Sequence, residues 1–160
     1  MMKPDASFLT SHPAHFIALG FGSGLAPKAP GTFGTLAALP LFWLLLQAGW
    51  SLPVLLFIVV ASFTLGIWAC AVTGKNLGVA DHGGIVWDEI VAIWLVLVFT
   101  PTDWIWWLVA FGLFRFFDIL KPWPIRFFDT RLKNGFGVMF DDLLAALYAL
   151  LIIKGWQWLA

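Results

Sequence analysis

Five long apolar stretches, separated by short polar segments, restrict the fold of this chain more than any other feature of its sequence. Of its 160 residues, 61% are hydrophobic and 11% are charged, whereas soluble domains average about 45–50% apolar and about 25% charged residues. Water cannot cover so large an apolar excess, so much of it must face lipid. We therefore expect an integral membrane protein that forms a single domain over residues 1–160.

The apolar stretches are long enough, or nearly so, to form membrane-spanning helices. A helix needs about 17–25 residues to cross a hydrocarbon core about 30 Å thick. We expect an all-α bundle of about five hydrophobic helices over residues 35–160, preceded by an N-terminal segment with a glycine-rich loop over residues 1–34. Thr35 is the expected N-cap of the first helix, and Ile125–Phe140 is expected to form a basic loop. The helices are predicted at 35–48, 52–72, 85–100, 104–120 and from Asp141 to the C-terminus.

Successive membrane helices run in opposite directions, so their ends fall alternately on two faces. The face where the first helix begins receives eight Lys and Arg residues, and the other face receives only Lys154. This asymmetry predicts that the first face is cytoplasmic. The acidic residues follow the same division, with Asp103 alone on the far face. Three separate acidic elements are therefore expected at one level on the cytoplasmic side.

These acidic elements form the candidate site, which comprises Asp88, Glu89, Asp118, Asp141 and Asp142. Carboxylates at membrane depth are costly and mark function by default, and several packed together repel one another unless a cation neutralises them. Because no Cys or His pair joins them, the ligands are all oxygen, which favours Mg²⁺, Mn²⁺ or Ca²⁺ over zinc. For any one element alone a structural role stays open, such as an acid at a helix N-terminus or a simple ion pair within one helix.

Basic residues near the acids suit a phosphate ligand. Lys28, Arg115 and Lys121 lie closest to the acids by topology and are candidates to hold phosphate oxygens. The glycine-rich segment Gly20–Thr35 allows a close approach of backbone to a ligand, and the hydroxyl of Thr32 offers a hydrogen bond, but a tight turn packed against helices explains the segment equally well. A net charge of zero without a long basic run argues against nucleic acid as a partner.

Four segments together resemble the phosphatidylglycerophosphatase A family, in the expected order over about residues 15–155. They are APGTFGT (Ala29–Thr35), DHGGIVWDEIV (Asp81–Val91), FRFFDILKPWPI (Phe114–Ile125) and GFGVMFDDLLA (Gly135–Ala145). The resemblance implies a phosphoric monoester hydrolase of phospholipid biosynthesis, which converts phosphatidylglycerophosphate to phosphatidylglycerol and phosphate. It also implies Mg²⁺ as the cofactor and the bacterial inner membrane as the location, with several membrane passes and the active site toward the cytoplasm.

The resemblance also assigns roles to individual residues. The family's characteristic acids coincide with the five candidate carboxylates, which are the expected metal ligands, and Lys121 joins them as a catalytic residue. The expected substrate-binding residues are Lys28, Thr32, Asp81, His82 and Arg115. A loop histidine is more often structural than catalytic, although a general-base role for His82 stays open.

Two other classes of function remain open from the sequence. A divalent-cation transporter also needs carboxylates within the membrane, but near the midplane and accessible from both faces. Another metal-dependent membrane enzyme that modifies lipids is the second alternative, although the DGxxAR segment typical of enzymes that join alcohols to CDP-activated lipids is absent from the sequence. The sequence indicates a phospholipid substrate in the bilayer and leaves the oligomeric state open.

Overall fold

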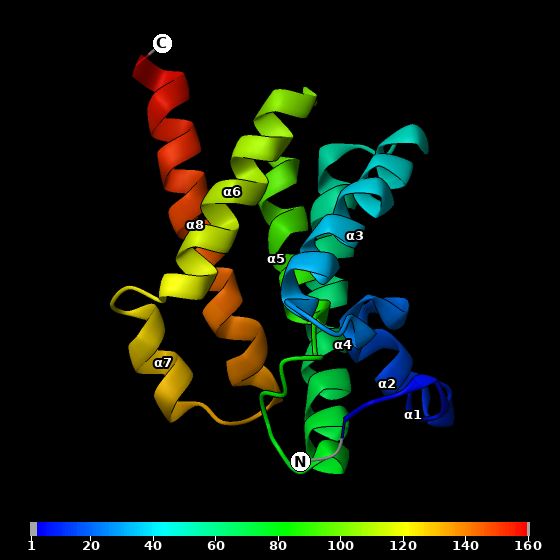
Figure 1. The fold of residues 1–160 in the computed structure, drawn as a ribbon. Helices are drawn as coiled ribbons and strands as arrows, with labels where there is room; N and C mark the ends of the chain where they lie inside the picture. Colours follow the sequence, from blue (N-terminus) through cyan, green and yellow to red (C-terminus); the bar gives the residue numbers. More distant parts are fainter. Residues whose placement is uncertain (1–2, 160) are drawn as a thin grey trace.

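The structure, a computed structural model, describes residues 3–159; residues 1, 2 and 160, at the ends of the predicted domain, lie outside this part. Its regular elements are all helical, and no strand occurs between residues 3 and 159 (Figure 1), which confirms the predicted all-α class. The helices in chain order are α1 (Ala6–Ser11), α2 (Pro13–Ala18), the 3₁₀-helix η1 (Gly20–Leu25), α3 (Pro30–Gln47), α4 (Leu52–Leu77), α5 (Trp87–Val98), α6 (Trp104–Leu120), α7 (Ile125–Arg131) and α8 (Gly135–Leu159).

Within residues 3–159, three helices are long and apolar enough to cross a membrane: α3, α4 and α8. The prediction of about five such helices is therefore supported for three. The other two apolar stretches form α5, with 12 residues, and α6, with 17 residues. At about 1.5 Å per residue, α5 is roughly 18 Å long. It ends at Val98 because Pro101 follows closely and cannot continue the helix.

Two predicted helix starts were wrong because a local signal lies further upstream. The first long helix begins at Pro30, since proline is favoured in the first turn of a helix. Thr35 is therefore not an N-cap: it is buried within α3, and its hydroxyl donates a hydrogen bond to the carbonyl of Gly31. The last helix begins at Gly135, because the side chain of Asn134 accepts a hydrogen bond from the backbone N–H of Gly137 at 2.9 Å, as an N-cap does.

Two predicted loops contain helices. The basic loop predicted over Ile125–Phe140 contains α7 and the first turns of α8. The N-terminal segment predicted over residues 1–34 contains α1, α2 and η1. Asp5 caps α1 by accepting from the N–H of Phe8, and the Nδ1 atom of His12 caps α2 by accepting from the N–H of Ala14. Polar N-cap residues therefore begin α1 and α2, two helices that apolar periodicity alone does not reveal.

Helix α5 lies at the centre of the bundle and contacts α3, α4, α6 and α8. Ile90, Ile93 and Leu97 on α5 are at most 1% exposed, which fits a helix surrounded by others. The first residues of α5 and α8 and the last residues of α6 all lie in the lower half of Figure 1, where α7 and the N-terminal helices also lie. The fold therefore gathers three helix ends in one region, as the topological argument predicted.

Candidate active site

The five candidate carboxylates lie at the gathered ends of α5 and α6 and about two turns into α8. Asp88 and Glu89 lie in the first turn of α5, Asp118 in the last turn of α6, and Asp141 and Asp142 in α8. The four aspartates are 3–8% exposed, so their charges are largely removed from water. The predicted convergence of these residues is thus present in the structure.

Three of these carboxylates lie closest together. Glu89, Asp118 and Asp142 each offer one oxygen, and the three oxygens lie within 4.8 Å of one another. Like charges at this separation repel strongly in a partly dry environment. A group of buried carboxylates from three helices therefore favours a bound cation at their centre.

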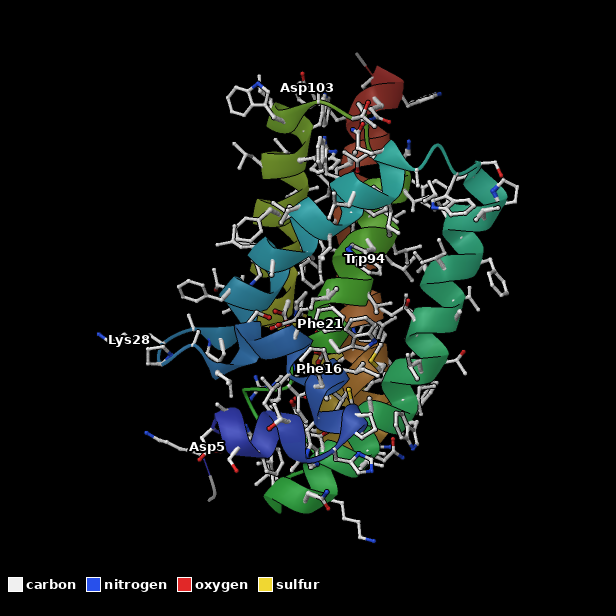
Figure 2. All side chains as sticks on the ribbon, turned by 90° about the vertical axis from the view of Figure 1, so that its right-hand side faces the viewer. Asp5, Phe16, Phe21, Lys28, Trp94 and Asp103 are labelled. Carbon is white, nitrogen blue, oxygen red and sulfur yellow. The ribbon has the colours of Figure 1, made fainter. Side chains whose placement is uncertain are left out.

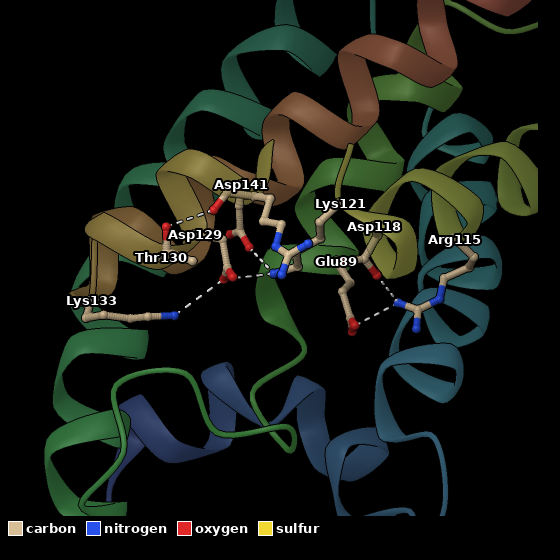
Figure 3. A network of polar contacts seen from close by, with 9 residues as sticks. Glu89, Arg115, Asp118, Lys121, Asp129, Thr130, Lys133 and Asp141 are labelled. Carbon is tan, nitrogen blue, oxygen red and sulfur yellow. Dashed lines mark hydrogen bonds and ion pairs between the residues drawn. The ribbon is translucent and has the colours of Figure 1, made fainter. Parts of the chain in front are cut away.

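Arg115 partly neutralises this group. Its guanidinium nitrogen Nη1 donates to Oε1 of Glu89 at 2.8 Å and to Oδ2 of Asp118 at 2.5 Å (Figure 3). The ion pair with Asp118 is the structural alternative considered from the sequence, and the structure extends it to α5 through Glu89. Arg115 thereby ties the end of α6 to the start of α5.

Lys121 belongs to a second network, which Figure 3 shows beside the first. Its ammonium donates to Oδ2 of Asp141 and, at 3.0 Å, to Oδ1 of Asp129, which Lys133 also approaches at 3.5 Å. Burial lowers the pKa of Lys121, but the charge of Asp141 outweighs burial and raises the pKa above its ordinary value. Burial raises the pKa of Asp129, but the hydrogen bond and charge of Lys121 prevail and lower that pKa. Lys121 therefore remains protonated at neutral pH.

Asp129 is a site residue that the sequence analysis missed. It lies on α7, eight residues after Lys121, and its carboxylate shares the Lys121 ammonium with Asp141. The sequence predicts a loop for the residues around it, and a loop gives no reason for Asp129 to point toward Lys121. Recognising Ile125–Arg131 as a helix packed against α8 supplies that reason.

The oxygens that remain unpaired test whether a metal ion fits here. Within residues 3–159, one buried oxygen on each of four candidate carboxylates has no hydrogen-bond partner: Asp88 Oδ1, Glu89 Oε2, Asp141 Oδ1 and Asp142 Oδ2. Leaving a buried acceptor unpaired is unfavourable, and more so for a charged one. Unpaired carboxylate oxygens gathered in one place are the donor set that a hard divalent cation prefers. The residues present therefore fit such a cation.

The glycine motif at the start of α3 is explained by a close contact with Glu89. A Cβ atom added at Gly31 would lie 1.9 Å from Oε1 of Glu89, and one at Gly34 would lie 2.6 Å from Cβ of Val86. Both distances are far shorter than any real contact, so a larger residue at Gly34 would clash with Val86, and one at Gly31 would force the Glu89 carboxylate to move. These two glycines lie within α3 rather than in a turn, and they bring this helix close to Glu89 and Val86 at the start of α5.

The structure does not gather all predicted substrate-binding residues around the carboxylates. Lys28 is exposed and points away from the helix bundle (Figure 2), and Thr32 is half-buried in the first turn of α3. His82 uses Nδ1 to accept from the N–H of Gly84 at 3.0 Å, which is a structural role in the turn before α5. Asp81 is exposed in the same turn. Only Arg115 of the five contacts the carboxylates directly in the described part of the chain.

Comparisons with known proteins cover the whole region that carries the site. The sequence profile of the family described as Phosphatidylglycerophosphatase A matches residues 16–157. Phosphatidylglycerophosphatase A of Haemophilus influenzae is 50% identical over 150 residues, which cover 92% of this chain and 90% of the relative. Phosphatidylglycerophosphatase A of Escherichia coli K12 is 44% identical over 151 residues, which cover 92% of this chain and 87% of the relative. The chain belongs to the phosphatidylglycerophosphatase A family.

This assignment confirms the resemblance inferred from the four motifs. In this member of the phosphatidylglycerophosphatase A family the matched region includes all five carboxylates, both cations that contact them and the glycine motif of α3. Helix α1 lies outside the match. No solved structure matches the chain.

Replacing Gly31 with alanine tests the contact between α3 and Glu89. The added methyl group must displace the Glu89 carboxylate, and a shift of about 1 Å in a catalytic group can lower activity by about 10²-fold. We expect Gly31→Ala to lower kcat at least about tenfold, measured as phosphate release from the lipid substrate. Gly112→Ala in α6 is the matched control, because an added Cβ there meets open space. Equal activity of the two variants would contradict the proposed importance of the contact.

Proposed function

We propose that this chain is a phosphatidylglycerophosphatase, which hydrolyses the phosphomonoester of phosphatidylglycerophosphate to give phosphatidylglycerol and phosphate. The observation that carries this proposal is the approach of Glu89, Asp118 and Asp142 to within 4.8 Å inside the region that matches the family. The relatives from Haemophilus influenzae and Escherichia coli bear the name of this activity and align with nine-tenths of the chain.

We infer that the site works with Mg²⁺. Glu89, Asp118 and Asp142 would hold the ion, and Asp141 has a buried oxygen free to join them. A bound Mg²⁺ would supply positive charge that orients the phosphoryl group and neutralises the charge developing on it. Mg²⁺ suits this donor set because carboxylate oxygens are hard ligands.

The protein's own residues would position the carboxylates, provide positive charge beside the phosphate and transfer the proton. Arg115 and Lys121 hold three of the carboxylates in place and place two positive charges beside the phosphate. The oxygen of a water molecule attacks phosphorus, and the bond from phosphorus to the glycerol oxygen breaks. Asp88 is the proposed general base, because its Oδ1 is buried and has no hydrogen-bond partner within residues 3–159. The proton taken from water then returns to the leaving glycerol oxygen.

We further propose that the chain crosses the bacterial inner membrane five times, with the site toward the cytoplasm. Helices α5 and α6 would join the three longer helices as spans, which requires local thinning of the bilayer or snorkelling of flanking residues. Eight of the nine Lys and Arg residues belong to segments on the side of the carboxylates, whereas Lys154 lies near the opposite end of α8. Positive residues of this distribution mark the cytoplasmic side.

Phosphate release from phosphatidylglycerophosphate by the purified protein in detergent tests the activity and its metal dependence. We expect release with Mg²⁺, loss of release after chelation with EDTA, and recovery when Mg²⁺ is added in excess. Zn²⁺ is expected to restore much less activity, because the donor set contains neither Cys nor His. Release that continues in EDTA would overturn the metal assignment. A well-folded protein that releases no phosphate with any divalent metal would overturn the enzyme assignment and favour cation transport.

A further inference from the structure

An apolar groove lies between α4, α5 and α8, beside the carboxylates. Its volume is about 180 Å³, and its walls are almost entirely apolar. Val60 and Phe63 contribute from α4, Val91 and Leu95 from α5, and Leu143 from α8. Pockets that enclose a whole drug-sized ligand have volumes of roughly 300–1,000 Å³. This groove is therefore too small for the body of a lipid and has room for a segment of one acyl chain.

One wall residue is ionisable, and it belongs to the candidate active site. Asp88 lines the groove, is 7% exposed, and carries the buried Oδ1 that lacks a hydrogen-bond partner within residues 3–159. Asp88 therefore connects one end of the apolar lining to the carboxylates of the candidate site.

The direction of the groove matches the direction of a phospholipid in the bilayer. Asp88 lies in the first turn of α5 and Leu95 two turns further along it, so the α5 wall extends about 10 Å at 1.5 Å per residue. Because α5 runs away from the gathered helix ends into the apolar bundle (Figure 1), the end of the groove at Asp88 lies toward the site and the end at Leu95 lies away from it. A phospholipid placed with its phosphate at the carboxylates would have its acyl chains pointing the same way.

We propose that this groove holds one acyl chain of the lipid substrate and thereby positions the phosphomonoester at the carboxylates. The inference rests on the proposed phosphatase function and deepens it, since it assigns a site for the apolar part of the substrate. The surrounding bilayer is as apolar as the groove, so the groove gives the chain little affinity. The groove instead orients the substrate, because an acyl chain held there limits the positions that the phosphate can take.

Filling the groove with a larger side chain tests this assignment. Ala92 lines the groove about one turn beyond Asp88, and Ala92→Leu narrows it where long chains must pass. The matched control is Ala61→Leu on the exposed face of α4, because Ala61 does not line the groove. The substrates are the dipalmitoyl and dibutanoyl forms of phosphatidylglycerophosphate. We expect Ala92→Leu to lower kcat/KM about tenfold for the dipalmitoyl form, as mismatches of one methylene or more do in apolar pockets, and to leave the dibutanoyl form almost unchanged.

Each result decides between named alternatives. An equal loss for both substrates, or the same activity as Ala61→Leu, would overturn the assignment of the groove. Wild-type protein inactive on both substrates would overturn the proposed function instead. If Ala92→Leu does not fold, Val60→Phe replaces it. Val60 lines the groove and is 63% exposed, so a larger ring there can narrow the groove without disturbing the packed core. The same selective loss for the long-chain substrate is expected, and its absence in Val60→Phe would equally overturn the proposal.

Discussion

Replacing Asp142 with asparagine is expected to lower kcat about 10³-fold while leaving the fold intact. Asparagine has nearly the same shape, but it removes one negative charge from the group formed with Glu89 and Asp118. Replacing a residue that only supports a metal ligand lowers metal affinity or activity about 10–100-fold. The loss of a ligand itself should lower activity by more than this. The measurement is kcat for phosphate release as a function of Mg²⁺ concentration, and the concentration giving half-maximal activity should rise as well.

Asp103→Asn is the matched control for this substitution. Asp103 caps the start of α6 at the opposite end of that helix from Asp118, where it accepts a hydrogen bond from the N–H of Ile105. The exchange is chemically the same, so any general effect of losing an acid appears in both variants. We expect near wild-type activity from Asp103→Asn. Asp142→Asn retaining more than about a tenth of wild-type activity would exclude Asp142 from the metal site.

Replacing Arg115 with methionine is expected to destabilise the protein by about 3–5 kcal/mol, because breaking a buried ion pair from one side leaves uncompensated charge. The side chain of Arg115 is 14% exposed and bridges Glu89 and Asp118. Methionine keeps most of the apolar stem of the side chain but provides no charge. Thermal or denaturant-induced unfolding in detergent without divalent metal measures the change. Added Mg²⁺ should recover part of it, since the ion would neutralise the same carboxylates.

The mechanism of this destabilisation can be separated from a simple loss of packing. Arg126→Met removes an arginine from the exposed surface of α7, and such changes usually alter stability by no more than about 0.5 kcal/mol. The double variant Glu89→Gln with Arg115→Met removes one charge of each sign, so it should be more stable than Arg115→Met alone. A double variant that is less stable than Arg115→Met would show that repulsion between the carboxylates is not the cause.

The convergence of the carboxylates could be predicted from the sequence because it depends on topology alone. Apolar stretches joined by short turns must alternate in direction, and that alternation places Asp88, Asp118 and Asp141 on one side whatever the details of packing. The distribution of the Lys and Arg residues, eight of nine on one side, independently identifies the same side. Neither argument requires knowledge of helix ends to within a turn. The wrongly predicted starts of α3 and α8 therefore do not change the predicted convergence of the carboxylates.

The contacts within the site could not be predicted in the same way. The approach of Gly31 to Glu89 depends on how α3 lies against α5, and a sequence pattern carries no information on the distance between two helices. The role of Asp129 depends on α7, a short helix without a clear apolar period. Asn134 does carry a recognisable capping signal, but a cap is identified only when the helix after it is placed correctly.

Both acidic pairs consist of adjacent residues on a helix, and adjacent residues point about 100° apart. Asp141 therefore faces Lys121, whereas Asp142 faces Glu89 and Asp118. One residue inserted between Asn134 and Asp141 would turn both carboxylates by that angle relative to the cap, and each would lose its present surroundings. Four inserted residues, slightly more than one full turn, would nearly restore the direction but displace both by about 6 Å along the axis. The number of residues from Asn134 to Asp141 thus sets which neighbours the two carboxylates face when α8 starts at this cap.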